Sequence, residues 1–212
     1  MSIDKVVVAI LLGDAHVSKR GSISFNHSID QKEYLEHKVS IMEDHGFKMR
    51  VYETDRLSYG KMRKFVRADG YVSTRSKELR NILYPQGLKI VPESYSEMFD
   101  FTDWSFIFMD DGRANVLSHT NNLINNIRIR KETEKFVNRY EICTESFDTT
   151  SNNLLMESLK GLGVESYISS RNRIIISKAT SKVNFYEGIN SYIVPSMNYK
   201  VSSLPTLSYK QQ

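Results

Sequence analysis

The chain has 212 residues, 40% of them hydrophobic and 25% charged, which is enough to bury a core as one large domain or two small ones. The longest apolar run is far shorter than the roughly 20 residues that span a bilayer, and an acid precedes it, unlike a signal peptide; we expect an intracellular protein with no membrane partner. One cysteine excludes a disulfide framework, and a net charge of +4 permits a polyanionic partner without requiring one.

The first predicted element is a buried helix that ends on an acid. Residues 6–12 are all apolar, and the run stops at Gly13-Asp14-Ala15. The last turn of a helix carries negative partial charge from unpaired carbonyls, so a carboxylate there is unfavourable unless a cation lies beside it. A divalent metal ion would supply this positive charge. The alternative for this segment alone is a solvated aspartate that follows a helix.

Strands and helices alternate through the rest of the first half. Residues 22–27 have a period of two, which predicts a strand with its apolar members in the core. A helix is predicted over 31–43, with Asp30 as N-cap and Gly46 at its end. A strand over 47–52, a short strand over 71–75 and a helix over 77–83 capped by Ser76 complete this half.

A second apolar run closing on an acid, Trp104–Gly112, begins the second half. Its Asp111 lies 97 positions after Asp14, nearly half the chain, which is typical of a duplicated domain. A strand over 140–144, a helix over 151–162, strands over 167–169 and 173–177 and a helix over 182–190 repeat the plan of the first half. We therefore predict one repeat over residues 1–94 and a second over 95–212.

The second repeat is longer by an insertion. Ser28 follows Asp14 by 14 residues and its counterpart Ser146 follows Asp111 by 35, a difference of 21 residues within Arg113–Asn138. Alternation of Ile127 and Ile129 with arginines predicts an extra hairpin near 113–138. The alternative is a loop without strands.

The two acid-terminated runs resemble the motif of the LAGLIDADG homing endonucleases, in particular the single-chain type with two pseudo-repeats. The last Asp-Gly of the motif falls on Asp14-Ala15 and on Asp111-Gly112. The earlier Asp of the motif is replaced by Leu12 in the first copy and Met109 in the second. The resemblance covers residues 6–200. It implies an α+β fold of two pseudo-symmetric αββαββα repeats, with the motif helices packed at the interface and a saddle-shaped antiparallel sheet in each half facing DNA.

The resemblance also implies a metal centre at the ends of the motif helices. Asp14 and Asp111 would be catalytic metal ligands, with Gly13 and Asp110 beside them, although Asp110 alone is as well explained as a structural or capping residue. Oxygen ligands suit Mg²⁺, for which Mn²⁺ can substitute. Lys89 and Lys200 match basic positions that lie near the metals in single-chain members of the family. They are therefore the further catalytic candidates. The five histidines show no metal-ligand spacing and are expected on the surface or facing DNA.

Polar residues that alternate with the core positions form a candidate DNA-binding surface. Such a face fits the major groove, where Arg and Lys suit guanine, Asn suits adenine and Glu accepts from cytosine. The alternative is a merely solvated sheet face. The candidates are Lys19, Arg20, Ser22, Ser24, Asn26, Lys48, Arg50, Tyr52, Tyr71, Ser73 and Arg75 in the first half, and Arg128, Arg130, Arg139, Glu141, Arg171, Arg173, Ser177 and Tyr199 in the second.

The resemblance implies a metal-dependent endonuclease that acts as a monomer, cuts both strands of a long double-stranded DNA site and leaves 3′ overhangs. Two alternatives share the fold: a maturase that assists splicing of its host intron RNA, and a DNA-binding protein that does not cleave. A maturase need not keep both motif acids. Both are present here, which favours cleavage.

Overall fold

The computed structural model describes residues 3–58, 60–119 and 134–201. The first half contains the helices α1 (Lys5–Leu12), α2 (Lys32–Asp44) and α3 (Thr74–Leu83), and the strands β1 (His16–Val17), β2 (Ile23–Ser28), β3 (Met49–Ser58) and β4 (Lys61–Gly70). The short helix α4 (Glu93–Ser96) follows. The second half contains the helices α5 (Phe101–Asp111), α6 (Thr149–Gly161) and α7 (Ala179–Asn190), and the strands β5 (Gly112–His119), β6 (Glu134–Ile142), β7 (Tyr167–Ile168) and β8 (Ile174–Ile176). The 3₁₀ turns η1 (Ile29–Gln31) and η2 (Pro195–Lys200) precede α2 and follow α7.

Each half contains one four-stranded antiparallel sheet. The strand order is β1-β2-β4-β3 in the first sheet and β5-β6-β8-β7 in the second, so each strand has a counterpart at the same place in the other sheet. The helices occur in the same order relative to these strands. The predicted α+β fold of two αββαββα pseudo-repeats is therefore confirmed.

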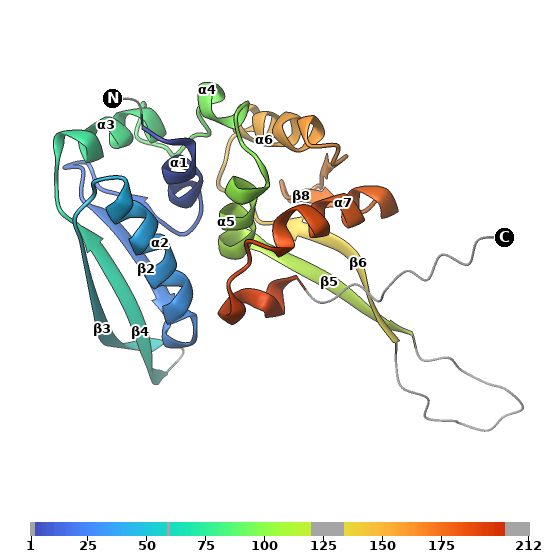
Figure 1. Ribbon diagram of the computed structural model, residues 1–212, viewed down its shortest axis with the longest axis horizontal. Coiled ribbons are helices and arrows are strands. Elements are labelled where there is room, and N and C mark those ends of the chain that lie inside the picture. The colour runs from blue at the N-terminus through green and yellow to red at the C-terminus, as the bar shows by residue number, and fades with distance from the viewer. Residues whose placement is uncertain (1–2, 59, 120–133, 202–212) are drawn as a thin grey trace, which may run out of the picture.

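The motif helices α1 and α5 pack against each other between the two sheets (Figure 1). Six of the eight residues of α1 are buried, from Val7 to Leu12. In α5 the run from Asp103 to Asp110 is buried. Helices that are apolar around their circumference must be enclosed on all sides, which the two halves achieve by placing them at their shared interface.

The sheets hold their polar faces away from this core because the strands alternate. In β2, Ile23, Phe25 and His27 are buried, while Asn26 is exposed. The hairpin β3–β4 continues the pattern, with Val66 and Ala68 of β4 in the core. Burial of alternate apolar side chains on one face stabilises the sheet and sets its register, since a shift by one residue would expose the whole set.

The insertion of the second half lies in the β5–β6 hairpin. These strands pair from Gly112 opposite Ile142 to His119 opposite Glu134, whereas their counterparts β1 and β2 pair over only two positions. Part of the added length lies in these longer strands, and the hairpin expected near 113–138 stays a prediction. The predicted strand at 126–130, with Arg128 and Arg130, lies outside the described residues.

Three local predictions in the first half are wrong. The strand predicted over 71–75 is absent from the described chain, since β4 ends at Gly70 and Ser73 is the N-cap of α3. Ser76, predicted as the cap, completes the capping box with Ser73. Asp30 does not cap α2, because the 3₁₀ turn η1 precedes that helix. Within the described ranges, the helices are all too short or too polar to cross a membrane.

Candidate metal centre and nucleic-acid interface

Two acids lie at the C-terminal ends of the paired motif helices. Asp111 is the last residue of α5, and Asp14 follows the C-cap of α1, Gly13. Burial and the negative charge of Asp14 raise the pKa of Asp111 to about 7. The pKa of Asp14 is raised as well, by burial and by the charge of Asp110. The charge of Asp14 thus acts on Asp111, and both acids favour the arrival of positive charge.

Two lysines bind the free carbonyls of these helix ends. The ammonium of Lys89 donates to the carbonyl oxygens of Leu11, Leu12, Gly13 and Ala15, at distances of 2.8–3.2 Å. Lys200 donates to the carbonyl oxygen of Asp110 at 2.6 Å. Burial lowers the pKa of Lys89 to about 8 and also lowers that of Lys200. Part of the cationic charge expected at the helix ends is therefore supplied by the protein itself.

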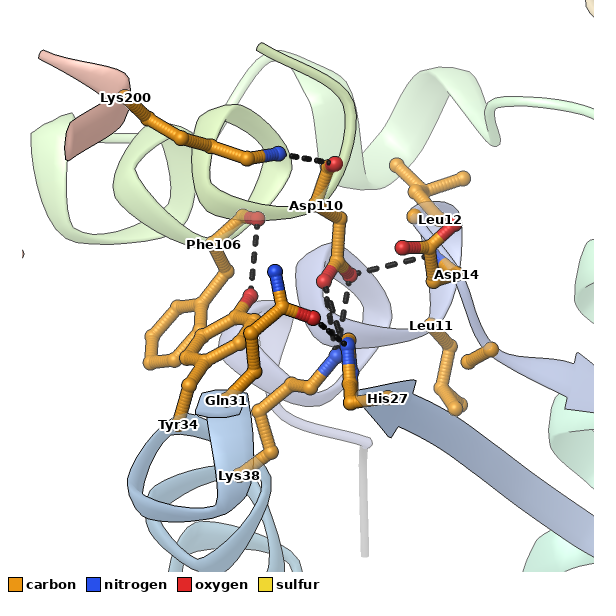
Figure 2. Close-up of polar contacts among 12 residues, drawn as sticks. Leu11, Leu12, Asp14, His27, Gln31, Tyr34, Lys38, Phe106, Asp110 and Lys200 are labelled. Atoms are coloured by element: carbon orange, nitrogen blue, oxygen red, sulfur yellow. Dashed lines mark hydrogen bonds and ion pairs between the residues drawn. The ribbon is translucent and has the colours of Figure 1, made fainter. Parts of the chain in front are cut away.

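Asp110 occupies the space between the two helices (Figure 2). Its carboxylate accepts from the Lys38 ammonium at 2.9 and 3.2 Å and from the backbone N–H of Asp14 at 3.1 Å. Gly13 makes this placement possible, because a Cβ built there would lie 2.2 Å from Asp110 Oδ2. Three acids and three lysines therefore meet around one point, namely Asp14, Asp110, Asp111, Lys38, Lys89 and Lys200.

His27 lies beside this cluster, which corrects the expectation that every histidine is on the surface or faces DNA. The residue is 4% exposed, and burial together with the charge of Lys38 lowers its pKa to about 4. Its Nδ1 lies 3.2 Å from Gln31 Oε1, and its Nε2 is buried without a hydrogen-bond partner among the described residues. His27 is neutral at physiological pH.

The structure brings together all the residues proposed from the sequence for the metal centre. Carboxylate oxygens of Asp14 and Asp110 and a ring nitrogen of His27 lie within 4.8 Å of one another, a spacing that can hold a metal ion. Asp111 is not part of this group, although burial and the charges of Asp14 and Asp110 raise its pKa. Oxygen-rich donor sets of this kind fit Mg²⁺ or Mn²⁺.

Sequence reasoning missed two members of this cluster, although each left a signal. His27 follows Ile23 and Phe25 at the next inward position of the β2 alternation. Lys38 stands in the buried stripe of α2. A basic residue at a core position indicates an ion pair or a site, because an unpaired buried charge is costly.

The polar face of the first sheet carries a network across three strands. Asp69 accepts from the Tyr52 hydroxyl at 2.6 Å and from Arg67 at 2.8 Å, and it lies opposite Arg50 in the strand register. Ser24 is paired with Asp69 on its other side. Arg67 and Asp69 were not among the candidates predicted from the sequence. Their alternation with the inward-facing Val66 and Ala68 is the signal that could have identified them. The face presents guanidinium, hydroxyl and amide groups, as a groove-binding surface requires.

The polar face of the second sheet is organised around Glu141, which is 1% exposed. Its carboxylate is paired with Arg113, with Arg139 at 2.6 Å and with Arg173 at 3.5 Å. Arg173 is also paired with Glu145. The proposal that Glu141 accepts from a cytosine is thereby corrected: its oxygens are occupied by arginines, whose positions it fixes.

The remaining candidates fall into four groups. Ser73 caps α3 and Arg75 donates to the carbonyl of His45, so neither belongs to a sheet face as predicted. Tyr199 accepts from Gln31 at 2.7 Å and is exposed. Exposed residues without a shown role in the fold are Lys19, Arg20, Lys48, Tyr71, Arg171 and Ser177, while Ser22 donates to the carbonyl of Gly70.

Comparisons with known proteins give one family and one fold. Residues 4–184 match the model of the LAGLIDADG DNA endonuclease family. A structure of the homing endonuclease I-WcaI bound to its DNA recognition sequence is 20% identical, with a TM-score of 0.71 over 97% of this chain and 89% of that chain. The meganuclease I-SmaMI bound to uncleavable DNA is 11% identical over 94% of this chain and 86% of that chain, with a TM-score of 0.47. A search of curated proteins finds no significant match.

Proposed function

Since this chain belongs to the LAGLIDADG DNA endonuclease family, we propose that it is a homing endonuclease that hydrolyses both strands of a long, specific DNA site and leaves 3′ overhangs. The observation that carries the proposal is that Asp14 and Asp111 stand at the C-terminal ends of two packed helices that lie between the two sheets. Each sheet would contact one half of the site, and the acids would lie beneath its centre.

Asp14 and Asp111 would hold the divalent metal, Mg²⁺ or its substitute Mn²⁺, with Gly13 and Asp110 beside it. Their raised pKa values fit this role, because both carboxylates lack a full countercharge in the protein alone. When bound, such an ion supplies a hydroxide nucleophile near neutral pH and stabilises the leaving oxygen of a phosphodiester.

Lys89 and Lys200 would each serve the scissile phosphate of one strand. Both are held by backbone carbonyls at the two helix ends, so their ammonium groups have fixed positions. A preorganised cation beside the phosphate stabilises the charge that develops during hydrolysis. The lysines belong to different halves, and their contributions need not be equal.

The two sheet faces would recognise the bases. Arg50 and Tyr52 in the first sheet, and Arg139 and Arg173 in the second, are held by the carboxylates of Asp69 and Glu141 or lie beside them. Arginines fixed in this way suit guanine edges in the major groove. Because one chain supplies both sheets, we expect it to bind its site as a monomer, which light scattering of the DNA complex would test.

The decisive experiment uses DNA that spans the insertion point of the gene, joined without the intervening sequence. Incubated with Mg²⁺ and the protein, a plasmid with this site should become linear, and mapping of the ends should show 3′ overhangs. Absence of cleavage together with tight binding of the host intron RNA would favour the maturase instead. Binding of the DNA without cleavage would favour the non-cleaving alternative.

A further inference from the structure

We infer that Asp14, His27 and Asp110 form a divalent-metal site with mixed oxygen and nitrogen ligands, which binds Mn²⁺ in preference to Mg²⁺. One ligand atom from each residue lies within 4.8 Å of the other two. The inference adds a nitrogen ligand to the proposed metal centre. It rests on the proposed endonuclease function only for what the bound metal does. Imidazole is a good ligand of first-row transition metals, whereas Mg²⁺ prefers oxygen alone.

The imidazole of His27 has one unpartnered nitrogen. Its Nε2 is buried, has no hydrogen-bond partner within the part of the chain that the structure describes, and lies 3.9 Å from Asp110 Oδ1. That separation is too long for a hydrogen bond. A buried polar atom without a partner costs free energy, so its retention here calls for a ligand that satisfies it.

A chain of hydrogen bonds orients the His27 imidazole for coordination. Gln31 donates through Nε2 to the Tyr199 hydroxyl at 2.7 Å, which directs its Oε1 toward His27 Nδ1 (Figure 2). An amide oxygen only accepts, so Nδ1 carries the proton and Nε2 presents its lone pair to the two carboxylates. Metal-ligating histidines are commonly held in this way, by a hydrogen bond from the opposite ring nitrogen.

The two halves differ at the position of His27. In the second half, the next inward position after Tyr140 and Ile142 is Thr144, whose hydroxyl donates to the carbonyl of Asn172 at 2.8 Å. This buried hydroxyl already has its partner and offers no nitrogen. The histidine ligand therefore comes from the first half and has no counterpart in the second.

Lys38 sets the conditions for binding. Its ammonium is paired with Asp110, so a metal ion would share that carboxylate with an existing cation. Each carboxylate oxygen has two lone pairs and can accept from both. Asp14 contributes a further negative charge, which also acts on Asp111. We expect the free protein to bind Mn²⁺ measurably but weakly, within the millimolar range.

The test is pulsed electron paramagnetic resonance of Mn²⁺ bound to the untagged, DNA-free protein, with affinities from calorimetry. We expect ¹⁴N modulation from a coordinated imidazole, tighter binding of Mn²⁺ than of Mg²⁺, and a loss of Mn²⁺ affinity of about tenfold or more in His27→Gln. Gln31→Leu should weaken binding through loss of the imidazole orientation. His45→Gln is the matched control and should leave the modulation unchanged.

A second variant guards against a folding defect in His27→Gln. Replacement of the other four histidines by Gln leaves His27 as the only imidazole of the chain, and the ¹⁴N modulation must persist. Absence of bound Mn²⁺, or bound Mn²⁺ without nitrogen modulation, overturns the inference. Because no DNA is present, these results do not depend on cleavage, and a protein that fails to cleave DNA can still confirm the site.

Discussion

The Lys38 ammonium lies 2.9 Å from Asp110 Oδ1, and neither side chain is exposed. Lys38 belongs to α2 of the first half and Asp110 to α5 of the second, so this ion pair crosses the interface between the halves. The rings of Phe25 and Tyr34 lie 5.0 and 4.5 Å from the ammonium and help to enclose it. Removal of one partner leaves the other as an uncompensated buried charge.

We therefore expect Lys38→Met to lower the free energy of unfolding by about 3–5 kcal/mol. The double variant Lys38→Met, Asp110→Asn should recover part of this loss, because neither charge then remains unpaired. Urea unfolding of the wild type and the variants measures both effects. Lys32→Met, which breaks the exposed pair with Glu53, is the control and should change little. Equal losses in the single and double variants would contradict the coupling.

Gly13 is expected to tolerate no side chain. In Gly13→Ala the new Cβ would meet Asp110 Oδ2 at 2.2 Å, so the carboxylate must move away from Lys38 and from the Asp14 amide. We expect a loss of stability of about 1–3 kcal/mol, measured by urea unfolding, and reduced DNA cleavage. Gly161→Ala places its Cβ where nothing lies within 4 Å, and it should fold as stably as the wild type. Wild-type behaviour of Gly13→Ala would show that Asp110 is free to shift.

The motif acids should be needed for cleavage rather than for binding. Asp14→Asn and Asp111→Asn each remove a charged metal ligand from the centre but leave both polar sheet faces in place. Plasmid cleavage should nearly cease, whereas gel-shift affinity should stay the same or increase, because an anion near phosphates has been removed. A large loss of affinity would assign these residues a structural role.

The two lysines should act on different strands. Lys89→Met and Lys200→Met each remove the ammonium from one helix end, so each variant should slow one strand far more than the other. Nicked circles should accumulate before linear plasmid, and end-labelled duplexes should show opposite strand preferences for the two variants. Thermal melting separates this effect from misfolding, which is of most concern for Lys89 because its removal frees four carbonyls. Equal slowing of both strands in a folded variant would refute the assignment.

Asp103 should give the stability of the protein a distinct pH dependence. It lies in the capping box of α5, and burial together with the charge of Asp100 raises its pKa to about 6 from an ordinary value of 3.8. The folded state therefore retains a proton that the unfolded chain releases, and this contribution to stability, complete below about pH 4, is lost as the pH rises through 6. Asp103→Asn keeps an acceptor for the Asp100 amide but cannot titrate. The free energy of unfolding of the wild type minus that of the variant, measured by urea unfolding, should decrease as the pH rises through this range. A difference that does not change with pH would contradict the raised pKa of Asp103.

The sequence by itself determined the repeated plan of the molecule. The two apolar runs that end at Asp14 and Asp111, and the alternation through β2 and the first part of β3, depend on local periodicity, which reports which face of a helix or strand is buried. The same rule would have placed β4, whose Val66 and Ala68 alternate with Arg67 and Asp69. Element boundaries were less certain, since the 3₁₀ turn before α2 and the capping box of Ser73 satisfy backbone groups in ways that the pattern does not reveal.

Only the tertiary structure decided which polar residues form the centre. Lys38 and Asp110 are 72 positions apart, and Lys89 reaches the carbonyl of Gly13 over 76 positions. Periodicity marks an inward position but does not identify the group that lies opposite it in the folded chain. The partner determines the energy, because a buried charge is stable only with a countercharge or a ligand. For this reason His27, expected at the surface, lies in the centre, and Glu141, expected to contact a base, is covered by arginines.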